Sequence, residues 1–421
     1  MVATLSFNGK ELAASLAYSS PRFHYFEAGA NILLSSEILK KENVLIRDDN
    51  LEALKYISQL NFKFNIIYID PPYNTGSKFT YNDLFKNFDG ISSVDSWLCM
   101  MWPRLILAHK ILKDDGVMFI SIDDRENSNL TVMMREIFGK ENHIGTLKWR
   151  KKNKPSFLDK HIGSVIEYVL IFSKNNNKLL KLIAEKTTEL SRPVLNASNA
   201  ISKRVLKSNT QAKCCDGIYK KGIYKNRTLE FEIENDAIIK NGLLLNNVIV
   251  NGKFRVSQSI LDETVFITKS FGLRRSVKDD EQKFRHATDD ATVDFESNED
   301  AETQLKKIFN GEKIFDFPKP VGLLKKILQM YQQRNNGNIH CLDFFAGSAT
   351  FAQAIYELNL ERNLNYTFCC IQSEEKINKK SIYNKIESIA DIAQQRIKYV
   401  EDKYKIFPRC KFFIPISQND E

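Results

Sequence analysis

The sequence of 421 residues lacks the features that place a chain in a membrane or direct it out of the cell. It contains no apolar run approaching the ~20 residues that a bilayer-spanning helix needs. Its opening residues, MVATLSFNGKEL, do not combine a basic segment with an apolar core, so we expect no secretory signal. These absences predict a cytoplasmic protein that has no membrane partner.

Patterns that bind metals or form disulfides are also scarce. The seven cysteines include two adjacent pairs, Cys214 with Cys215 and Cys369 with Cys370, and none has Cys-x-x-Cys spacing. Free thiols in a reducing compartment are the simplest interpretation. The six histidines are scattered along the chain and form no recognisable ligand set. We therefore predict that the protein has no metal site.

Positive charge is present in excess and is unevenly distributed. The formal net charge is +9, and residues 201–285 hold 17 lysines and arginines against 10 aspartates and glutamates. This concentration argues against a charge that is basic by chance. An acidic run follows between Asp289 and Glu302, and we expect it to be a solvated linker or a surface strip.

Alternating apolar patterns predict an α/β fold in two separate stretches. Three short apolar runs in the first stretch are typical of buried strands: residues 65–70, 116–124 and 167–174. The segments between them, such as LEALKYISQL, carry apolar residues at helical spacing. The same texture returns in residues 338–350 and 368–375 after a middle part of short β-like pieces. Strands that alternate with helices predict βαβ units and a mostly parallel sheet.

One turn at the end of a predicted strand combines a carboxylate, a stiff carbonyl and an aromatic ring. It is DPPYNTG, from Asp70 to Gly76, and ligands of open α/β sheets bind at this edge. Pro71 and Pro72 have a fixed φ and no N–H, so the turn presents carbonyl oxygens without competing donors. Asp70 and the Pro71 carbonyl can accept two amino hydrogens while Tyr73 stacks on the ring that carries them. An ordinary β-turn with a buried tyrosine is the alternative.

A second turn contains small residues and precedes a helix. It is DFFAGSAT, from Asp343 to Thr350. Small residues let a ligand approach the backbone closely, and the helix that follows offers free N–H groups. The next predicted strand ends near Glu375, where a carboxylate can hold ribose hydroxyls as in dinucleotide-binding folds. Helix capping by Ser348 or Thr350 is the alternative.

Together these residues resemble the β class of amino-group DNA methyltransferases, and in particular the modification subunits of type III restriction systems and their type II relatives. The catalytic turn comes before the cofactor loop, with a variable segment between them, which is the order of the β class. The resemblance covers these further segments: DNLEAL (49–54), WLCMMWPRLILA (97–108), DDGVMFISIDD (114–124), EIFG (136–139), IFDFPKP (314–320) and IADIAQQRI (389–397).

The resemblance implies a Rossmann-like α/β fold with circularly permuted motif order. Its core would be a mainly parallel, seven-stranded methyltransferase sheet with an inserted target recognition domain. The chain would divide into a catalytic half (1–175), the target recognition domain (176–310) and a half that binds S-adenosyl-L-methionine (311–421).

The resemblance also implies roles for single residues. Asp70, Pro71, Pro72 and Tyr73 would form the catalytic turn. The remaining roles concern the cofactor: Asp343, Phe345, Gly347 and Ser348 in the loop on its methionine side, Lys319 and Pro320 closing over it, Glu375 at the ribose, and Asp49 near the adenine. The family's F-x-G-x-G pattern has Ala349 at its last position here, and Glu374 competes with Glu375 for the ribose.

In this family DPPY favours the N6 amino group of adenine, so the expected activity is site-specific methylation of a flipped-out adenine in double-stranded DNA. A reactive cysteine in a Pro-Cys motif, which cytosine C5 methylation needs, is absent. N4-cytosine methylation and a non-catalytic DNA-binding homologue are the alternatives. Family analogy suggests a homodimer and a separate restriction subunit as partners. The chain is short for a type III subunit, so a type II or solitary enzyme is equally open.

Basic residues in two places are candidates for contacts with DNA phosphates or base edges. The run KWRKKNK, residues 148–154, is one of them, with a solvated surface run as the alternative. The others lie in the middle of the chain: Lys203, Arg204, Lys207, Lys220, Lys221, Arg274 and Arg275.

Overall fold

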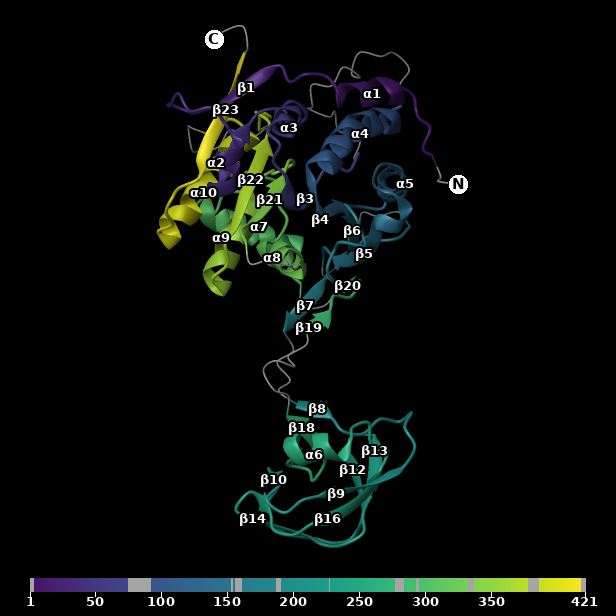
Figure 1. Cartoon of the computed structure of the whole chain (residues 1–421). Helices are drawn as coiled ribbons and strands as arrows, with labels where there is room; N and C mark the ends of the chain where they lie inside the picture. The colour runs from purple at the N-terminus through teal and green to yellow at the C-terminus, as the bar shows by residue number, and fades with distance from the viewer. Residues whose placement is uncertain are drawn as a thin grey trace. The chain divides into compact units, whose positions relative to one another are not determined.

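The computed structural model describes residues 4–74, 92–152, 154–155, 161–186, 191–226, 228–276, 284–292, 295–331, 337–377 and 386–417. The chain forms two compact units (Figure 1). The larger unit combines Met1–Ala184 with His286–Glu421, and the smaller unit is Glu185–Arg285. The smaller unit lies inside the segment for which the sequence predicts a target recognition domain.

The larger unit is built on one ten-stranded sheet. In spatial order its strands are β1 (Phe23–Glu27), β23 (Lys411–Ser417), β2 (Val44–Arg47), β22 (Tyr366–Gln372), β21 (Ile339–Asp343), β3 (Phe64–Ile69), β4 (Leu112–Ile122), β6 (Ile166–Ser173), β5 (His143–Arg150) and β20 (Asp290–Ala291).

Most neighbouring strands of this sheet run parallel, which confirms the predicted α/β class. The exceptions are β1 on β23 and β6 between β4 and β5, which pair antiparallel. The sheet is wider than the seven strands expected because β1 and β23 extend one edge and β20 extends the other. Strand β20 belongs to the acidic run, which is therefore not merely a linker: Asp290 pairs with Lys148 of β5.

Helices cover both faces of the sheet. The side chains of each strand point alternately to the two faces, so each face has a core of its own. On β3, Ile67 and Ile69 face one core while Ile66 and Tyr68 face the other. The first core includes side chains of α1 (Lys10–Leu16), α2 (Ser36–Lys41), α3 (Asn50–Gln59), α4 (Ser93–Ile111) and α5 (Asn127–Phe138). The second includes α8 (Val321–Met330), α9 (Thr350–Arg362) and α10 (Ile389–Tyr404). In the described residues of the larger unit, the other helical elements are α7 (Asn298–Ile308) and a 3-10 turn (Lys140–Asn142).

The neighbouring parallel strands β21 and β3 mark the switch point of the sheet. Cys341 of β21 lies in register with Ile66 of β3, so both strands end at the same edge. The chain leaves β3 toward α4 on one face, whereas it leaves β21 into α9 on the other. Ligands of open α/β sheets bind in the crevice that such a divergence opens.

Where it is described, the smaller unit consists of β-strands and one helix, α6 (Gln258–Thr264). It has a core of its own, with Phe231, Val250 and Leu273 among its buried residues. A seven-stranded sheet contains β11 (Gly217–Tyr219), β14 (Ala237–Lys240), β15 (Leu243–Leu244), β10 (Gln211–Ala212), β17 (Val265–Ile267), β18 (Leu273–Ser276) and β8 (Ser191–Pro193). A four-stranded sheet contains β12 (Gly222–Asn226), β13 (Leu229–Ile233), β16 (Val248–Gly252) and β9 (Ser202–Leu206). Strands β7 (Ile183–Lys186) and β19 (Phe284–His286) pair separately.

The longest helix, α4, has a buried and mostly apolar sequence that includes Pro103. Neither it nor any other helix in the described ranges is long and apolar enough to span a bilayer.

Candidate functional site

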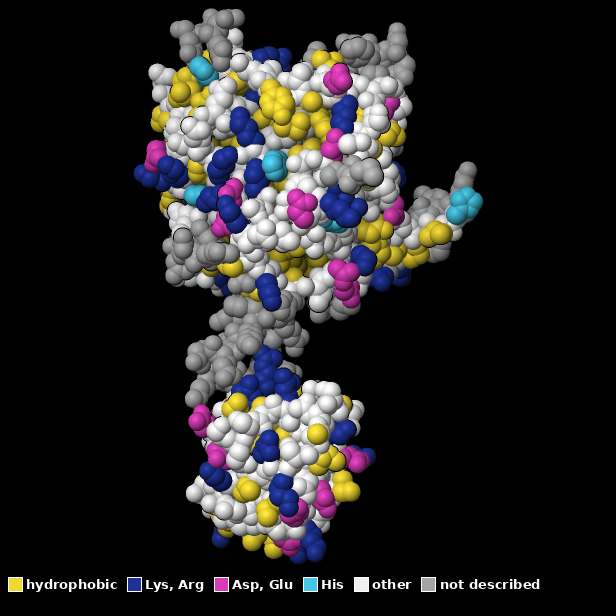
Figure 2. All heavy atoms as spheres, turned by 45° about the vertical axis from the view of Figure 1, so that its right-hand side comes forward, with side chains coloured by type: hydrophobic (Ala, Val, Ile, Leu, Met, Phe, Trp, Pro, Cys, Tyr) yellow, Lys and Arg dark blue, Asp and Glu magenta, His cyan; other side chains and the backbone are white. Residues whose placement is uncertain are grey.

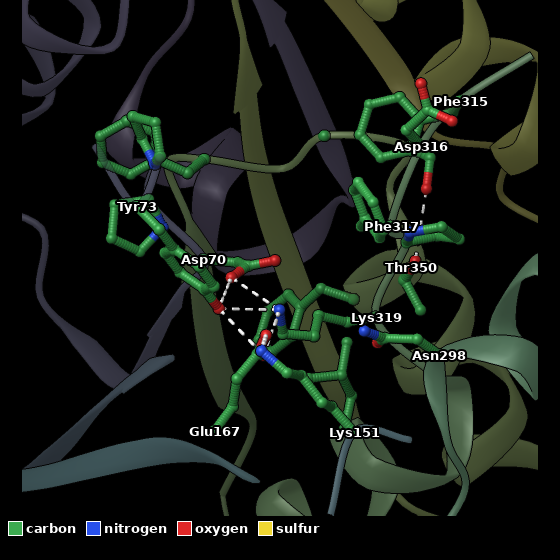
Figure 3. A pocket seen from close by; sticks show the side chains of 18 of the residues that line it. Asp70, Tyr73, Lys151, Glu167, Asn298, Phe315, Asp316, Phe317, Lys319 and Thr350 are labelled. Atoms are coloured by element: carbon green, nitrogen blue, oxygen red, sulfur yellow. Dashed lines mark hydrogen bonds and ion pairs between the residues drawn. The ribbon is translucent and has the colours of Figure 1, made fainter. Parts of the chain in front are cut away.

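A cavity of about 570 Å³ lies at the edge of the larger sheet where β3 and β21 end (Figure 3). Both turns singled out in the sequence line it. Its wall includes Asp70, Pro71, Pro72 and Tyr73 from the first turn, and Asp343, Phe345, Gly347 and Ser348 from the second. Residues that are 277 positions apart in the chain, Asp70 and Gly347, therefore share one cavity.

The first turn is held in place by neighbours that fix its backbone and its end. The indole N–H of Trp97 in α4 donates to the Pro72 carbonyl at 2.6 Å. The Asn74 side chain donates to Glu126 at 2.7 Å, and Asn74 itself has a left-handed φ of 53°. No hydrogen bond to the Pro71 carbonyl is formed within the part of the chain that the structure describes. Thr75 and Gly76 of the motif lie outside that part.

A cluster of charged groups surrounds the Asp70 carboxylate. Tyr73 donates its hydroxyl hydrogen to Asp70 Oδ1 at 2.6 Å, and Lys319 Nζ lies 3.0 Å from the same oxygen. Lys319 Nζ also donates to the Tyr73 hydroxyl at 2.8 Å and lies 3.2 Å from Glu167 Oε2. The other oxygen of Glu167 lies 3.2 Å from Lys151 Nζ. The dashed lines of Figure 3 trace this network.

Burial and neighbouring charges shift the pKa values of this cluster in different directions. Burial raises the pKa of Asp70, although Lys319 and the Tyr73 hydroxyl oppose it. Burial likewise raises the pKa of Glu167, but Lys319 and Lys151 outweigh it and the net pKa falls. For Lys319, burial lowers the pKa and the two carboxylates more than compensate. The cluster therefore favours ionised Glu167 and Lys319 beside an aspartate that gains a proton more readily than usual.

The second turn has a tight backbone that only small residues can adopt. Gly347 has a φ of +53°, and a Cβ on it would lie 3.3 Å from the Phe315 ring. Its N–H donates to Gln372 at 2.7 Å, which ties the turn to β22. Ala349 also has a left-handed φ, of 57°, and this explains why the family pattern places glycine there. Asp343 accepts the N–H of Phe345 at 3.0 Å, and burial raises its pKa well above the usual range.

Two fully buried arginines brace this turn from outside the cavity. Arg104 of α4 donates to Asn50, whose side-chain amide donates to the Phe344 carbonyl at 2.5 Å. Arg396 of α10 donates to the hydroxyls of Ser348 at 3.0 Å and Thr350 at 2.6 Å. The turn is thus supported by helices from both faces of the sheet.

The structure places the remaining predicted residues around the cavity in different ways. Lys319 lines it, whereas Pro320 is the buried N-cap residue of α8 beside it. Asp49 is outside the cavity wall, caps α3 by accepting the Leu51 N–H, and lies 3.3 Å from Arg104 Nη2. Of the two competing acids, Glu374 is bound by Arg47 at 2.6 Å and by the Ser388 hydroxyl at 2.8 Å. Glu375 makes no ion pair within the described ranges and does not line the cavity.

Sequence reasoning did not single out several residues that shape the site. Glu167 lies at the start of an apolar strand, and a carboxylate there is a sequence signal for a functional group at the end of the sheet. Lys151 was noted only as part of a basic run, but it faces the cavity and pairs with Glu167. Trp97, Arg104 and Arg396 gave no separate signal because their partners are distant in the sequence.

Several DNA-contact candidates of the smaller unit are already paired with acids of that unit. Lys203 lies 2.7 Å from Glu234, Lys207 lies 2.6 Å from Asp262, and Lys220 lies 3.0 Å from Asp236. Figure 2 shows Lys and Arg side chains of this unit lying among Asp and Glu side chains on the visible face. Arg204 lies over the Phe254 ring, 5.7 Å from its centroid, and Arg274 donates to the Ser191 hydroxyl at 2.8 Å.

The chain is similar to proteins of restriction-modification systems. The StyLTI Mod subunit, a type III restriction-modification enzyme of Salmonella typhimurium, is 30% identical over 88% of this chain, which spans 58% of that subunit. The type II methyltransferase M.KpnI of Klebsiella pneumoniae is 28% identical over 87% of this chain and 89% of its own. Among solved structures, the M1.HpyAVI-SAM complex matches at 14% identity and a TM-score of 0.39, with 84% of this chain and 98% of that one covered. A likeness at that level carries no argument about the site.

The sequence profile described as DNA methylase matches residues 64–385. This span contains both turns, the cavity between them and the whole of the smaller unit. The chain belongs to the DNA methylase family.

Proposed function

We propose that this protein transfers a methyl group from S-adenosyl-L-methionine to the N6 amino group of an adenine that is flipped out of double-stranded DNA. The observation that carries the proposal is the single cavity lined by both the Asp70–Tyr73 turn and the Asp343–Ser348 turn. One turn offers acceptors for an amino group, and the other offers a small-residue cradle for a cofactor.

The residues around the second turn fit the proposed cofactor. Phe345 provides an apolar wall, and the first N–H groups of α9 have no side-chain cap, so they can receive a carboxylate. Phe345, Gly347 and Ser348 would hold the methionine part, with Asp343 at the base of the turn and Lys319 and Pro320 at its border. The roles of Glu375 at the ribose and Asp49 near the adenine rest on the family resemblance. Bound there, the cofactor supplies a methyl group on a positively charged sulfur.

The first turn would bind and orient the base. Flipping an adenine out of the duplex costs a few kcal/mol, and stacking on Tyr73 would return roughly 1–3 kcal/mol. Asp70 and the Pro71 carbonyl would accept the two amino hydrogens, which directs the nitrogen lone pair toward the methyl group, while Pro72 keeps the turn rigid. The partly buried Asp70 carboxylate would also stabilise the positive charge that develops on the nitrogen.

The smaller unit would serve as the target recognition domain, within residues 176–310, between the catalytic half (1–175) and the half that binds S-adenosyl-L-methionine (311–421). Its lysines and arginines would contact DNA phosphates by exchanging their acidic partners, such as Glu234, for the DNA backbone. We further propose that the protein works in the cytoplasm within a restriction-modification system, with a restriction subunit or a second copy of itself as partner. The StyLTI Mod subunit and M.KpnI among its relatives support the restriction-modification part of this proposal.

N4-cytosine methylation is the second candidate because it uses the same kind of site: a carboxylate, a carbonyl and a cofactor cradle. The preference for adenine over cytosine rests only on the DPPY motif at Asp70, which favours adenine N6 in the family. A chain that only binds DNA is the third alternative, and the complete Asp70–Tyr73 turn argues against it.

The test is methyl transfer by the purified full chain. Tritiated S-adenosyl-L-methionine and mixed-sequence duplex DNA are incubated with it, and the DNA is digested to nucleosides. We expect N6-methyladenine as the labelled product, and we expect Asp70→Ala to abolish it while nonspecific DNA binding persists. N4-methylcytosine alone would assign the second candidate, and an unlabelled product from a folded chain would support the third.

A further inference from the structure

The Lys319 ammonium contacts two of the three groups that the proposed function reserves for the substrate base, Asp70 and Tyr73. Lys319 Nζ lies 3.0 Å from Asp70 Oδ1 and donates to the Tyr73 hydroxyl at 2.8 Å. It also lies 5.0 Å from the centroid of the Tyr73 ring. The Lys319 side chain is only 6% exposed, whereas that of Asp70 is 24% exposed, so the ammonium is buried and the carboxylate keeps one side open.

A partly buried acceptor that waits for a substrate is stabilised by a partner in the meantime. The Asp70 carboxylate has lost part of its hydration, and a hydrogen-bonded ion pair with Lys319 offsets that loss. The amino group of a base and a lysine ammonium are both N–H donors, so one can replace the other on Asp70. Lys319 is this partner when no base is bound.

Glu167 gives the ammonium a second place to go. Its Oε2 already lies 3.2 Å from Lys319 Nζ, and its Oε1 lies 3.2 Å from Lys151 Nζ. The cluster holds two carboxylates, Asp70 and Glu167, and two ammonium groups. If Lys319 leaves Asp70 for Glu167, the ammonium keeps a carboxylate partner, and Asp70 can accept a neutral amino group without leaving a buried positive charge unpaired.

We propose that Lys319 is a resident substitute for the substrate amino group, and that Glu167 is the positioning residue that receives its ammonium when the base enters. This inference rests on the proposed function, since it assumes that Asp70 binds an amino group. It differs from a purely structural ion cluster in one respect. Removing Glu167 should leave Lys319 bound to Asp70 and block the base, and removing Lys319 as well should make Asp70 available to the base again.

The experiment uses the full chain with Glu167→Gln, Lys319→Met and the double variant. Methionine suits position 319 because it is unbranched and apolar, and it adapts to irregular gaps. We expect Glu167→Gln to lower kcat/KM for DNA by about 10- to 100-fold, because the base must then displace an ammonium that has no other carboxylate. We expect the double variant to have a kcat/KM for DNA about tenfold higher than that of Glu167→Gln. The Kd for S-adenosyl-L-methionine should stay within about twofold of the wild-type value in Glu167→Gln.

The chain offers a matched control in Glu52→Gln. Glu52 forms a similarly buried pair with Lys55 at 2.8 Å in α3, with side chains 4% and 5% exposed, and it is outside the cavity. This variant removes the same chemical group from the same unit, so we expect it to leave kcat/KM unchanged. The midpoint of unfolding, measured for every variant, identifies any that have lost their fold.

The acidic side of the pH profile gives a second readout, which reports the charges that act on Asp70. The charged and titratable groups that act on Asp70 are Lys319, Glu167, Tyr73, Tyr68 and Asp343, with Lys151 acting through Glu167. Glu167→Gln removes a negative neighbour, so the pKa of Asp70 should fall and the acidic limb of kcat/KM should move to lower pH. Lys319→Met removes the positive neighbour and should move that limb to higher pH.

Suppression of Glu167→Gln by Lys319→Met, with limbs shifted in opposite directions in the two single variants, supports the proposal. A double variant no faster than Glu167→Gln, or a Glu167→Gln variant as active as Glu52→Gln, overturns it. A wild-type chain that transfers no methyl group overturns the proposed function and this inference with it. An active wild type without suppression overturns the inference alone.

Discussion

The two units of this protein handle charge in opposite ways. In the larger unit, Lys319 and Glu167 form a pair whose side chains are each 6% exposed beside a cavity. In the smaller unit, Lys203 and Glu234 form a pair whose side chains are 59% and 33% exposed. Burying charges is costly unless every group is paired, whereas exposed pairs cost and contribute little. The buried pair beside the cavity is therefore a candidate for chemistry, whereas an exposed pair such as Lys203 with Glu234 can exchange partners at little cost.

The largest effect should come from replacing Asp70, the proposed acceptor of the amino hydrogen. Asp70→Asn keeps the shape but removes the negative charge, so we expect kcat to fall by about 10²- to 10³-fold, as when one group that stabilises developing charge is lost. Asp48→Asn is the control, because burial also raises the pKa of Asp48, to about 6, and Asp48 lies outside the cavity. Equal losses in both variants, measured by tritium transfer, would contradict a special role for Asp70.

The aromatic face of Tyr73 should matter next. If a base stacks on it, Tyr73→Ala should weaken binding of the flipped base by about 5- to 150-fold. Tyr73→Phe keeps the ring and loses only the hydroxyl that donates to Asp70 at 2.6 Å, so it should retain most of the binding. Fluorescence of 2-aminopurine at the target position measures the flipped state. Equal loss in both variants would assign the effect to the hydroxyl and not to stacking.

The pH dependence of the reaction follows from the raised pKa of Asp70. The ionised carboxylate only accepts hydrogen bonds, whereas the protonated carboxyl presents an O–H donor to the amino group. Burial makes Asp70 take up a proton at higher pH than an ordinary aspartate. As pH falls, kcat/KM should therefore begin to drop above the ordinary aspartate pKa of about 3.9, by about tenfold per pH unit. A profile that stays flat down to that pKa, in a chain that is still folded, would contradict this assignment.

The smallest effect is expected at the exposed pairs of the smaller unit. Lys203→Gln removes one partner of Glu234, and we expect no measurable change in the midpoint of unfolding. If Lys203 contacts a phosphate, the slope of log Kd for DNA against log salt should decrease in magnitude by about 1. Fluorescence anisotropy at several salt concentrations measures it. An unchanged slope would remove Lys203 from the DNA contact surface and would sharpen the contrast between the two units.

Much of the larger unit could be predicted from local sequence. The apolar runs before Asp70 and Asp343 are strands β3 and β21, because fully buried parallel strands require continuous apolar residues. Strands β1, β2 and β23 were not predicted; β1 and β23 widen the sheet by pairing chain segments from opposite ends of the sequence. Local patterns carry no information on such pairings.

The candidate site was only half visible in the sequence. The rigid Asp70–Tyr73 turn and the small-residue turn at Gly347 were evident because proline, glycine and their spacing restrict the backbone wherever they occur. The partners of Asp70 were not evident: Lys319 was expected at the cofactor, and Glu167 was not singled out. Lys319 and Glu167 lie 3.2 Å apart because the segment before α8 and strand β6 both reach the cavity at the end of β3.

The sequence by itself determined the two turns, the strands that lead into them and the family to which they belong, because each depends on neighbours along the chain. Only the tertiary structure decided which charges share the cavity and which remain in solvent. The physical reason is that burial and ion pairing depend on distance in space, and the groups that set the charge of Asp70 come from residues about 100 and 250 positions away.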